Sequence, residues 1–258
     1  MTPRSSSERV ADGVARGVTI PTASAEVRLE DEPDGSTTVW VGGVPSSSMR
    51  PEKDVLDFEY MRHEAAVVDA WARPERFLAL HVGAGVCTLP RYLAYRYDDS
   101  RHIAVDVDAD LPLLARQWWD LPRAPRLRIR EQDGLDAVAS RHDASVDLIV
   151  RDAFAGDETP QSLADDVWWA HARRALRPGG LVIANIGTRP GGQAHRADAA
   201  AAAAHFTGLV AIGEPAVLKG RRRGNVILAA APALNVDSLR RYAASAPLPT
   251  GVSTRWPS

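Results

Sequence analysis

Four successive apolar runs each end in residues that could bind a polar ligand. The residues that follow these runs are Gly83-Ala84-Gly85, Asp106-Val107-Asp108, Gln132-Asp133-Gly134 and Asp152. Glycines directly after a strand let the backbone turn sharply and approach a ligand closely. An acid about twenty residues after such a turn, as Asp106 is, can accept hydrogen bonds from ribose hydroxyls. The order and spacing therefore predict a binding site for a nucleoside.

The acids also indicate the charge of the ligand. Asp133 is placed to reach the exocyclic amine of an adenine, and no basic residue stands in the glycine turn to favour a phosphate. Acids at three of the four strand ends fit a ligand that carries a positive charge, such as S-adenosylmethionine or its decarboxylated form, each of which has a sulfonium. Taken singly, each acid could equally cap a helix or lie in a solvated loop.

The elements that must position these residues alternate along the chain. Apolar runs at 77–82, 103–107, 127–130, 146–150, 181–186 and 225–229 predict strands, and the segments 109–119, 161–176 and 193–206 predict helices. Residues 177–180, Arg-Pro-Gly-Gly, are expected to end the helix before them. This alternation favours an α/β fold with a parallel sheet covered on both faces, whose ligands bind at the carboxyl ends of the strands.

The first fifty residues have a different character. Residues 1–22 are polar and aperiodic, and we expect a flexible leader there. Residues 23–53 predict a small β element, with alternating segments at 25–30 and 37–41 around a turn and a loop over 42–48. A helix is predicted over 54–72, where the main domain, 54–258, begins.

Composition narrows the classes of function. The chain has 258 residues, a formal charge of -2 and one cysteine, Cys87. The single cysteine excludes an internal disulfide framework, and the histidines show no metal-ligand spacing, so no metal is expected. The charge gives no basic field for nucleic acid or a membrane surface, and no apolar run approaches the ~20 residues of a membrane span. A cytoplasmic protein is the expectation.

The motifs together resemble a known family. LALHVGAGVCTLPRYL, AVDVDADL, EQDG, VDLIVRDAFAG and LRPGGLVIANI follow one another in the order seen in the spermidine synthases, and VWVGGVPSSSM and LDFEYMRHEA resemble their lead-in hairpin and first helix. The resemblance is greater to the spermidine synthase-like proteins of actinobacteria, and it covers roughly residues 25 to 230.

The resemblance implies a Rossmann-like sheet of the S-adenosylmethionine-methyltransferase type behind a small N-terminal β domain. It implies transfer of an aminopropyl group from decarboxylated S-adenosylmethionine to a small-molecule amine, by a homodimer or homotetramer. Position by position, it implies co-substrate binding by Gly83, Gly85, Asp106, Asp133 and Gly134, a channel for the amine lined by Tyr60, and proton acceptance by Asp152.

The implied role of Asp152 agrees with elementary chemistry. An alkyl amine has a pKa of about 10, so at neutral pH it is protonated and not nucleophilic. A carboxylate can hold the ammonium and take its proton as the nitrogen attacks the carbon beside the sulfonium.

Several positions depart from the family pattern. Val86, Ala155 and Met61 stand where the family has amine-binding polar residues, and Ser46 replaces a glutamine. Asp157 and Glu158 are candidate replacement carboxylates. These departures keep two alternatives open: a methyltransferase that uses S-adenosylmethionine in the same site, and a binding protein that keeps the fold without catalysis.

Overall fold

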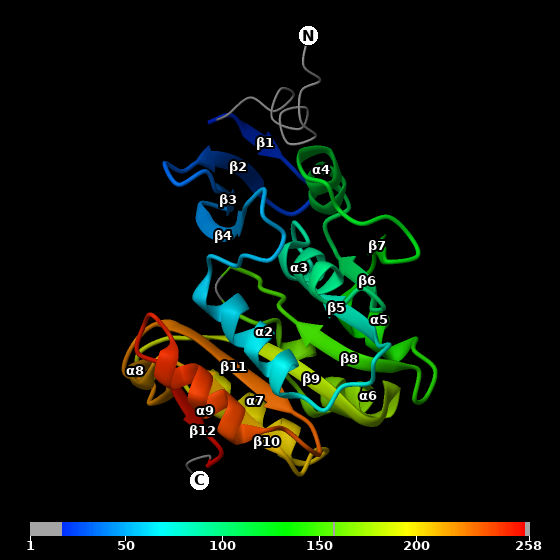
Figure 1. The fold of residues 1–258 in the computed structure, drawn as a ribbon, viewed down its shortest axis with the longest axis vertical. Coiled ribbons are helices and arrows are strands. Elements are labelled where there is room, and N and C mark those ends of the chain that lie inside the picture. Colours follow the sequence, from blue (N-terminus) through cyan, green and yellow to red (C-terminus); the bar gives the residue numbers. More distant parts are fainter. Residues whose placement is uncertain (1–16, 157, 256–258) are drawn as a thin grey trace.

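The computed structural model describes residues 17–156 and 158–255, which form two sheets (Figure 1). The smaller sheet is antiparallel, in the order β1 (Thr19–Pro21), β2 (Glu26–Asp31), β3 (Thr37–Val41) and β4 (Val44–Met49). It lies at the top of the view in Figure 1, whereas β10 and β12 of the larger sheet lie at the bottom.

The larger sheet has eight strands in the order β12-β10-β11-β9-β8-β5-β6-β7. Its parallel part consists of β5 (Leu78–Val82), β6 (Arg101–Asp106), β7 (Leu127–Glu131), β8 (Val146–Arg151) and β9 (Leu176–Thr188). An antiparallel extension follows, made of β10 (Leu209–Gly213), β11 (Gly224–Ala230) and β12 (Gly251–Ser253).

Helices cover both faces of the larger sheet, as the sequence predicts. One face packs against α2 (Glu59–Ala70), α3 (Thr88–Arg96) and α9 (Val236–Ser245). The other packs against α5 (Gly134–Ala139), α6 (Asp166–Ala175) and α7 (Ala194–Ala203). Strand β5 shows why its run is apolar throughout: Leu80 and Val82 enter one core and Ala79 the other. The expected α/β fold class is confirmed. A short helix, α8 (Pro215–Leu218), follows β10.

The smaller sheet packs on α4 (Asp110–Trp118) and on the turn after β5. Val27, Leu29 and Val39 share this core with Leu111 and Trp118. A polar tie strengthens the junction, because one carboxylate oxygen of Asp108 accepts hydrogen bonds from the hydroxyls of Thr22 and Ser24, each at 2.6 Å. The smaller sheet is thus held beside the carboxyl ends of the parallel strands.

The N-terminal region holds more strand than the sequence predicts. The expected loop over 42–48 is wrong: Gly42 and Gly43, at φ +58° and +77°, make a tight turn, and Val44–Met49 returns as β4. Two glycines at positive φ are the usual connection of a two-residue hairpin. Residues 19–21, within the expected leader, pair with β2, and residues 1–16 lie outside the described residues.

The segment 161–176 also differs from the prediction of one helix. Residues Gln161–Leu163 form a single 3-10 turn, and α6 begins only at Asp166. The side chain of Asp165 caps the helix by accepting a hydrogen bond from the Trp168 amide at 2.9 Å. The helix ends at Ala175, just before residues 177–180, which belong to the long strand β9.

Within the described ranges, no helix combines the length and apolar character that crossing a membrane requires.

Candidate active site

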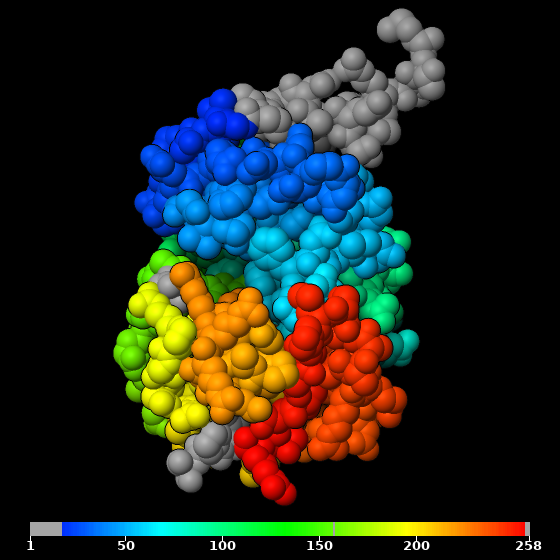
Figure 2. Space-filling model, turned by 90° about the vertical axis from the view of Figure 1, so that its left-hand side faces the viewer, coloured from blue at the N-terminus to red at the C-terminus, as the bar shows by residue number. Residues whose placement is uncertain are grey.

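A cavity of about 890 Å³ lies between the smaller sheet and the carboxyl ends of β5, β6 and β8. Figure 2 shows the hollow on one face of the molecule, below the blue N-terminal sheet and above the orange and yellow segments. The residues to which the family resemblance assigns binding or catalysis all line it: Tyr60, Gly83, Gly85, Asp106, Asp133, Gly134 and Asp152. The structure therefore brings the candidates into one site, while their individual roles stay predictions.

The glycine turn between β5 and α3 forms the floor of the cavity. Gly83 has φ +79°, and a Cβ there would lie 2.5 Å from the carbonyl oxygen of Asp152, so only glycine fits. Gly85, at φ +50°, has nothing within 4 Å of the place where a Cβ would stand. Gly83 thus lets the ends of β5 and β8 approach each other closely, and Gly85 leaves open space above the turn for a ligand.

Asp106 supports the turn from the end of β6. Its Oδ2 accepts a hydrogen bond from the Gly85 amide at 2.8 Å, and its Oδ1 accepts one from the Asp108 amide at 3.0 Å. Burial raises the pKa of Asp106, although these backbone hydrogen bonds oppose the rise. The carboxylate is held rigidly at the position from which the sequence predicts contact with a ribose.

Asp133 serves as the N-cap of α5. Its Oδ1 accepts hydrogen bonds from the amides of Leu135 and Asp136, at 2.8 and 3.1 Å. The alternative role of helix cap is therefore real, and it fixes a carboxylate that also lines the cavity. Gly134 allows the close approach of this helix, because a Cβ there would lie 2.5 Å from Cγ1 of Val82.

Asp152 follows β8 and lies beside polar groups from two other elements. Its Oδ1 accepts a hydrogen bond from the Asn185 side-chain amide at 2.7 Å. Burial raises the pKa of Asp152 to about 6, against the opposing effect of Asn185 and of the Tyr60 hydroxyl. Tyr60 also donates a hydrogen bond to the carbonyl oxygen of Ser46 at 3.3 Å, which connects α2 to the smaller sheet.

Two buried polar residues were not anticipated from the sequence. Asn185 lies on β9 inside an apolar run, and a polar side chain within the segment LVIANI was the signal that could have identified it. Glu64 lies on α2 and is completely buried. Glu64 directly follows two other polar residues, Arg62 and His63, in the predicted helix. The sequence therefore does not indicate that its side chain is buried.

The substituted positions make part of the cavity wall apolar. Val86 and Met61 are buried and line the cavity, and Ala155 is exposed at its rim. Glu158 does not replace the missing acids, since it is exposed and forms an ion pair with Arg189 at 3.4 Å. Asp157 lies outside the described residues.

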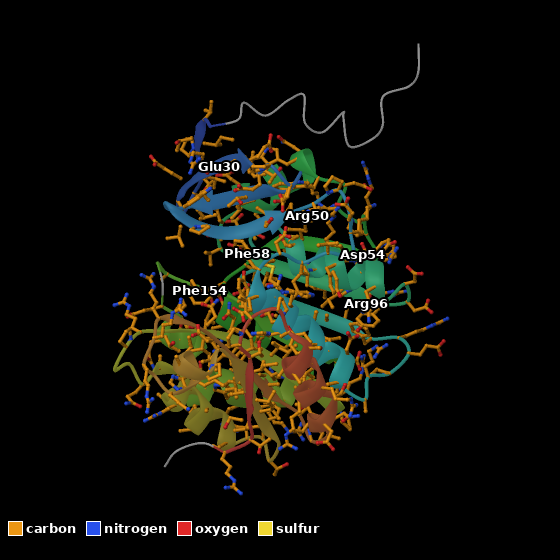
Figure 3. All side chains as sticks on the ribbon, turned by 60° about the vertical axis from the view of Figure 1, so that its left-hand side comes forward. Glu30, Arg50, Asp54, Phe58, Arg96 and Phe154 are labelled. Atoms are coloured by element: carbon orange, nitrogen blue, oxygen red, sulfur yellow. The ribbon has the colours of Figure 1, made fainter. Side chains whose placement is uncertain are left out.

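Aromatic side chains stand near the mouth of the site. Figure 3 shows Phe58 and Phe154 at the junction between the smaller sheet and the main domain. Phe154 lines the cavity and keeps 37% of its surface exposed. Phe58 packs edge-to-face on Tyr60, with ring centroids 6.0 Å apart, and so helps to fix the Tyr60 ring.

Cys87, which follows the glycine turn, is buried, and burial raises the pKa of its thiol to about 12. It is therefore a packing residue and not a nucleophile.

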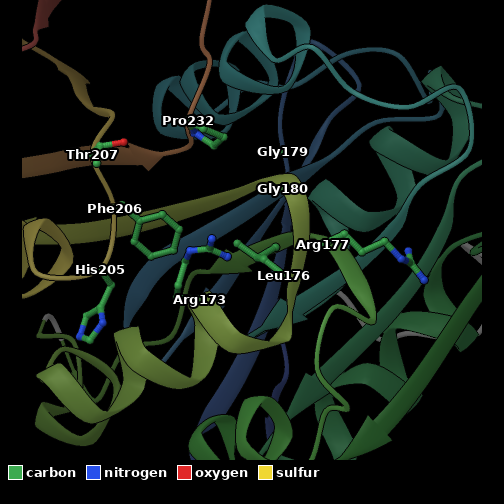
Figure 4. Close-up of a pocket in the computed structure, with 9 residues that line it drawn as sticks. All are labelled: Arg173, Leu176, Arg177, Gly179, Gly180, His205, Phe206, Thr207 and Pro232. Atoms are coloured by element: carbon green, nitrogen blue, oxygen red, sulfur yellow. The ribbon is translucent and has the colours of Figure 1, made fainter.

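A second cavity, of about 140 Å³, lies beside the start of β9 and is lined by Arg173, Arg177 and His205 among others (Figure 4). Its volume suits a few water molecules and not a nucleoside. Across residues 17–156 and 158–255, no three His, Cys, Asp or Glu side chains gather as a metal site would require.

Comparisons with known proteins agree with this geometry. The crystal structure of a probable spermidine synthase from Corynebacterium glutamicum ATCC 13032 matches with a TM-score of 0.86 and 32% identity, over 93% of this chain and 91% of that one. The polyamine aminopropyltransferase of Neisseria meningitidis serogroup A is 27% identical over 116 residues. That match spans 44% of this chain and 43% of the relative, so less than half of the curated relative is represented.

A more distant structure shows the fold alone. Human methyltransferase-like protein 13, solved in complex with SAH, is 22% identical and has a TM-score of 0.60 over 73% of this chain and 90% of that one. No family model matches the sequence. The expected methyltransferase-type fold is confirmed, and so is the resemblance noted from the motifs. With 32% identity over nearly all of the Corynebacterium protein, the chain belongs to the spermidine synthase family.

Proposed function

We propose that this protein transfers an aminopropyl group from decarboxylated S-adenosylmethionine to a small-molecule amine, with Asp152 as the proton acceptor. The observation that carries the proposal is the position of Asp152 in the same cavity as the glycine turn and the two strand-end acids, Asp106 and Asp133. The name of the Neisseria relative, polyamine aminopropyltransferase, supports the same reaction class.

In the proposed reaction, the nitrogen of the acceptor attacks the carbon bonded to the sulfonium. A carbon–nitrogen bond forms and the carbon–sulfur bond breaks, with its electron pair going to sulfur. Methylthioadenosine leaves as a neutral thioether and needs no acid, while the proton of the amine passes to Asp152. The main task of the protein is to align the nitrogen, the carbon and the sulfur.

The local chemistry of Asp152 supports the role of base. Its pKa of about 6 leaves the carboxylate ionised at neutral pH, yet closer to the pKa of the amine than an exposed aspartate would be. In this proposal Asp106 binds the ribose and Asp133 binds the adenine. The open space above Gly85 accommodates the nucleoside.

Thermal melts distinguish this function from the two alternatives. A ligand at ~100 times its Kd stabilises the native state by about 2.7 kcal/mol, which a melt resolves. We expect methylthioadenosine to raise the Tm more than S-adenosylhomocysteine does. The reverse order would favour a methyltransferase, and no shift with either would contradict a nucleoside site and favour a non-catalytic protein.

A further inference from the structure

Two buried histidines on neighbouring strands form a hydrogen-bonded chain that ends at the cavity. His81 on β5 lines the cavity and is 2% exposed. Its Nε2 lies 3.0 Å from Nδ1 of His102 on β6, and Nε2 of His102 lies 2.8 Å from Oγ of Ser100. The Ser100 hydroxyl in turn lies 2.5 Å from the carbonyl oxygen of Tyr97. The reaction proposed above gives this chain of residues no role.

The last acceptor of the chain fixes the positions of its protons. A carbonyl oxygen can only accept, so the single proton of the Ser100 hydroxyl is donated to Tyr97. The Ser100 oxygen must then accept from His102, which places a proton on Nε2 of that ring.

The two rings carry one proton each. Burial lowers the pKa of His81 to about 3 and holds the pKa of His102 well below its usual value, so both are neutral at pH 7. Because the proton of His102 is on Nε2, its Nδ1 accepts a hydrogen bond from Nε2 of His81. The Nδ1 atom of His81 is therefore unprotonated and presents a lone pair.

This lone pair faces the cavity. His102 lies opposite Ala79, which is two residues nearer the start of β5 than His81 is. The two nitrogens of an imidazole ring point away from each other, so Nδ1 of His81 is directed toward the end of the strand, where the cavity lies. Nδ1 has no partner among the described residues. Solvent reaches this atom, whereas both ring nitrogens of His195 are sealed in the interior.

His81 lies at the end of the cavity where the proposed reaction takes place. Its neighbour on β8 is Val150, and Asp152 follows two residues later on the same face of the sheet. The pairing of the two strands extends this far, because the Asp152 amide donates to the carbonyl oxygen of Val82 at 2.8 Å. The Cα atoms of His81 and Asp152 are thus about 8 Å apart, from the spacing of neighbouring strands and the rise per residue.

The group that the lone pair requires is an N–H or O–H donor of a ligand. The nearby wall residues Val86 and Met61 have no such group. In the proposed reaction both co-substrates carry an ammonium group, the donor at the end of its aminopropyl chain and the acceptor at its amine. An ammonium group has three N–H donors, and a neutral imidazole accepts from one of them without repelling the charge.

We propose that His81 is a ligand-binding residue whose Nδ1 accepts a hydrogen bond from the ammonium group of a co-substrate. The identity of the co-substrates rests on the proposed function, but the tautomer and position of His81 do not. The ammonium group belongs either to the aminopropyl chain of the donor or to the amine acceptor, and the experiment distinguishes these two sources.

Nitrogen-15 NMR of the histidine rings tests the tautomer in the wild-type protein. We expect His81 to show a protonated Nε2 and an unprotonated Nδ1 at pH 7, with its signals assigned by their loss in His81→Leu. The Nδ1 signal should move toward that of a hydrogen-bonded nitrogen when the ammonium ligand binds, and methylthioadenosine, which has no ammonium group, should leave it in place. A protonated Nδ1 would overturn the inference.

Calorimetry identifies the ligand. The Kd values of methylthioadenosine, of decarboxylated S-adenosylmethionine, and of 1,4-diaminobutane with methylthioadenosine bound are compared between the wild type and His81→Leu. We expect one of the two ammonium ligands to bind roughly 10- to 100-fold more weakly to the variant, as for loss of a hydrogen bond to a charged group. The ligand that loses affinity is the one that His81 contacts. The Kd of methylthioadenosine should not change, which also verifies that the variant is folded.

Two further variants control the comparison. His81→Asn keeps an acceptor oxygen near the position of Nδ1 and should recover part of the lost affinity. His195→Leu makes the same change at another buried histidine, which is 1% exposed and does not line the cavity, and it should match the wild type.

The outcomes separate this inference from the proposed function. Unchanged Kd values for both ammonium ligands in His81→Leu, or an equal loss for methylthioadenosine, would overturn the inference while transfer by the wild type still stands. A selective loss in a wild-type background that forms no methylthioadenosine would support the binding role of His81 and refute the transferase. A wild type that binds neither ammonium ligand would overturn the inference.

Discussion

At the scale of single residues, Asp152 differs from an ordinary surface aspartate through what surrounds it. The Asn185 amide fixes one oxygen at 2.7 Å, and burial raises its pKa to about 6. The strand-end position identified Asp152 from the sequence alone. Asn185 could have been identified as the polar residue within an apolar run, but its partner Asp152 lies on another strand, which local pattern does not reveal. The burial of Glu64 depends on elements far away in the chain and leaves no local signal.

The pKa of Asp152 predicts the acidic limb of the pH–rate profile. The carboxyl group accepts a proton only when ionised, so kcat/KM should fall tenfold per pH unit below about pH 6. The same limb should be absent from the binding of methylthioadenosine, which needs no base. Steady-state assays from pH 5 to 8 check this, and a kcat/KM that stays level down to pH 5, as expected for an aspartate with its usual pKa of about 4, would refute a perturbed base.

At the scale of elements, the turn between β5 and α3 is the feature that the sequence predicted most closely. The apolar run, the two glycines and the acid at the end of β6 could all be recognised in the sequence, because local backbone conformation and strand burial require these residue types. The strand β4 was not predicted, since Ser46-Ser47-Ser48 is typical of a loop. Its serines find their partners only in the folded protein: Ser47 bonds to Thr88 at 2.5 Å and Ser48 to Asp57 at 2.6 Å.

The two glycines of the turn should respond differently to alanine. Gly83→Ala places a Cβ 2.5 Å from a backbone oxygen and should lower the free energy of unfolding by more than about 3 kcal/mol. Gly85→Ala meets no neighbour, so only its positive φ costs stability, about 1–2 kcal/mol, but its methyl group enters the ligand space and should weaken methylthioadenosine binding. Urea unfolding and calorimetry measure the two effects. Equal losses of stability would contradict this account of the turn.

At the scale of the whole molecule, the smaller sheet forms one wall of the cavity, and its attachment depends on Asp108. From the sequence, Asp108 was grouped with Asp106 among the acids at the strand ends. In the structure its carboxylate accepts hydrogen bonds from Thr22 and Ser24 in the N-terminal region. Burial would raise its pKa, but the hydrogen bonds from Ser24 and Thr22 outweigh burial and lower it to about 2. Its contribution to stability is therefore complete above pH 4 and lost as the pH falls toward 2.

Asp108→Asn should loosen this attachment. Hydrogen bonds to a charged group contribute about 1.5–3 kcal/mol, so we expect a loss of that order in the free energy of unfolding at pH 7. Hydrogen exchange should quicken in β1 and β2, while the strands of the larger sheet stay protected. Unchanged exchange in β1 would show that the apolar core alone holds the smaller sheet.

The expected homodimer or homotetramer stays a prediction at this scale. Trp168 and Trp169 in α6 are both completely buried within the subunit. They are therefore not available for contact with another subunit. Light scattering on the eluted protein measures the mass directly. Two or four copies per particle is the expected result, and a monomer at every concentration would contradict it.

The central claim, aminopropyl transfer with Asp152 as the base, is tested most directly by the formation of methylthioadenosine. Decarboxylated S-adenosylmethionine and 1,4-diaminobutane are incubated with wild type and with Asp152→Asn, and both products are followed by mass spectrometry. The account predicts turnover by the wild type, a loss of about 10²–10⁴-fold in the variant, and unchanged methylthioadenosine binding. Equal turnover by the two proteins would remove Asp152 from the mechanism, and a wild type that forms no methylthioadenosine with this or any other amine would contradict the proposed reaction.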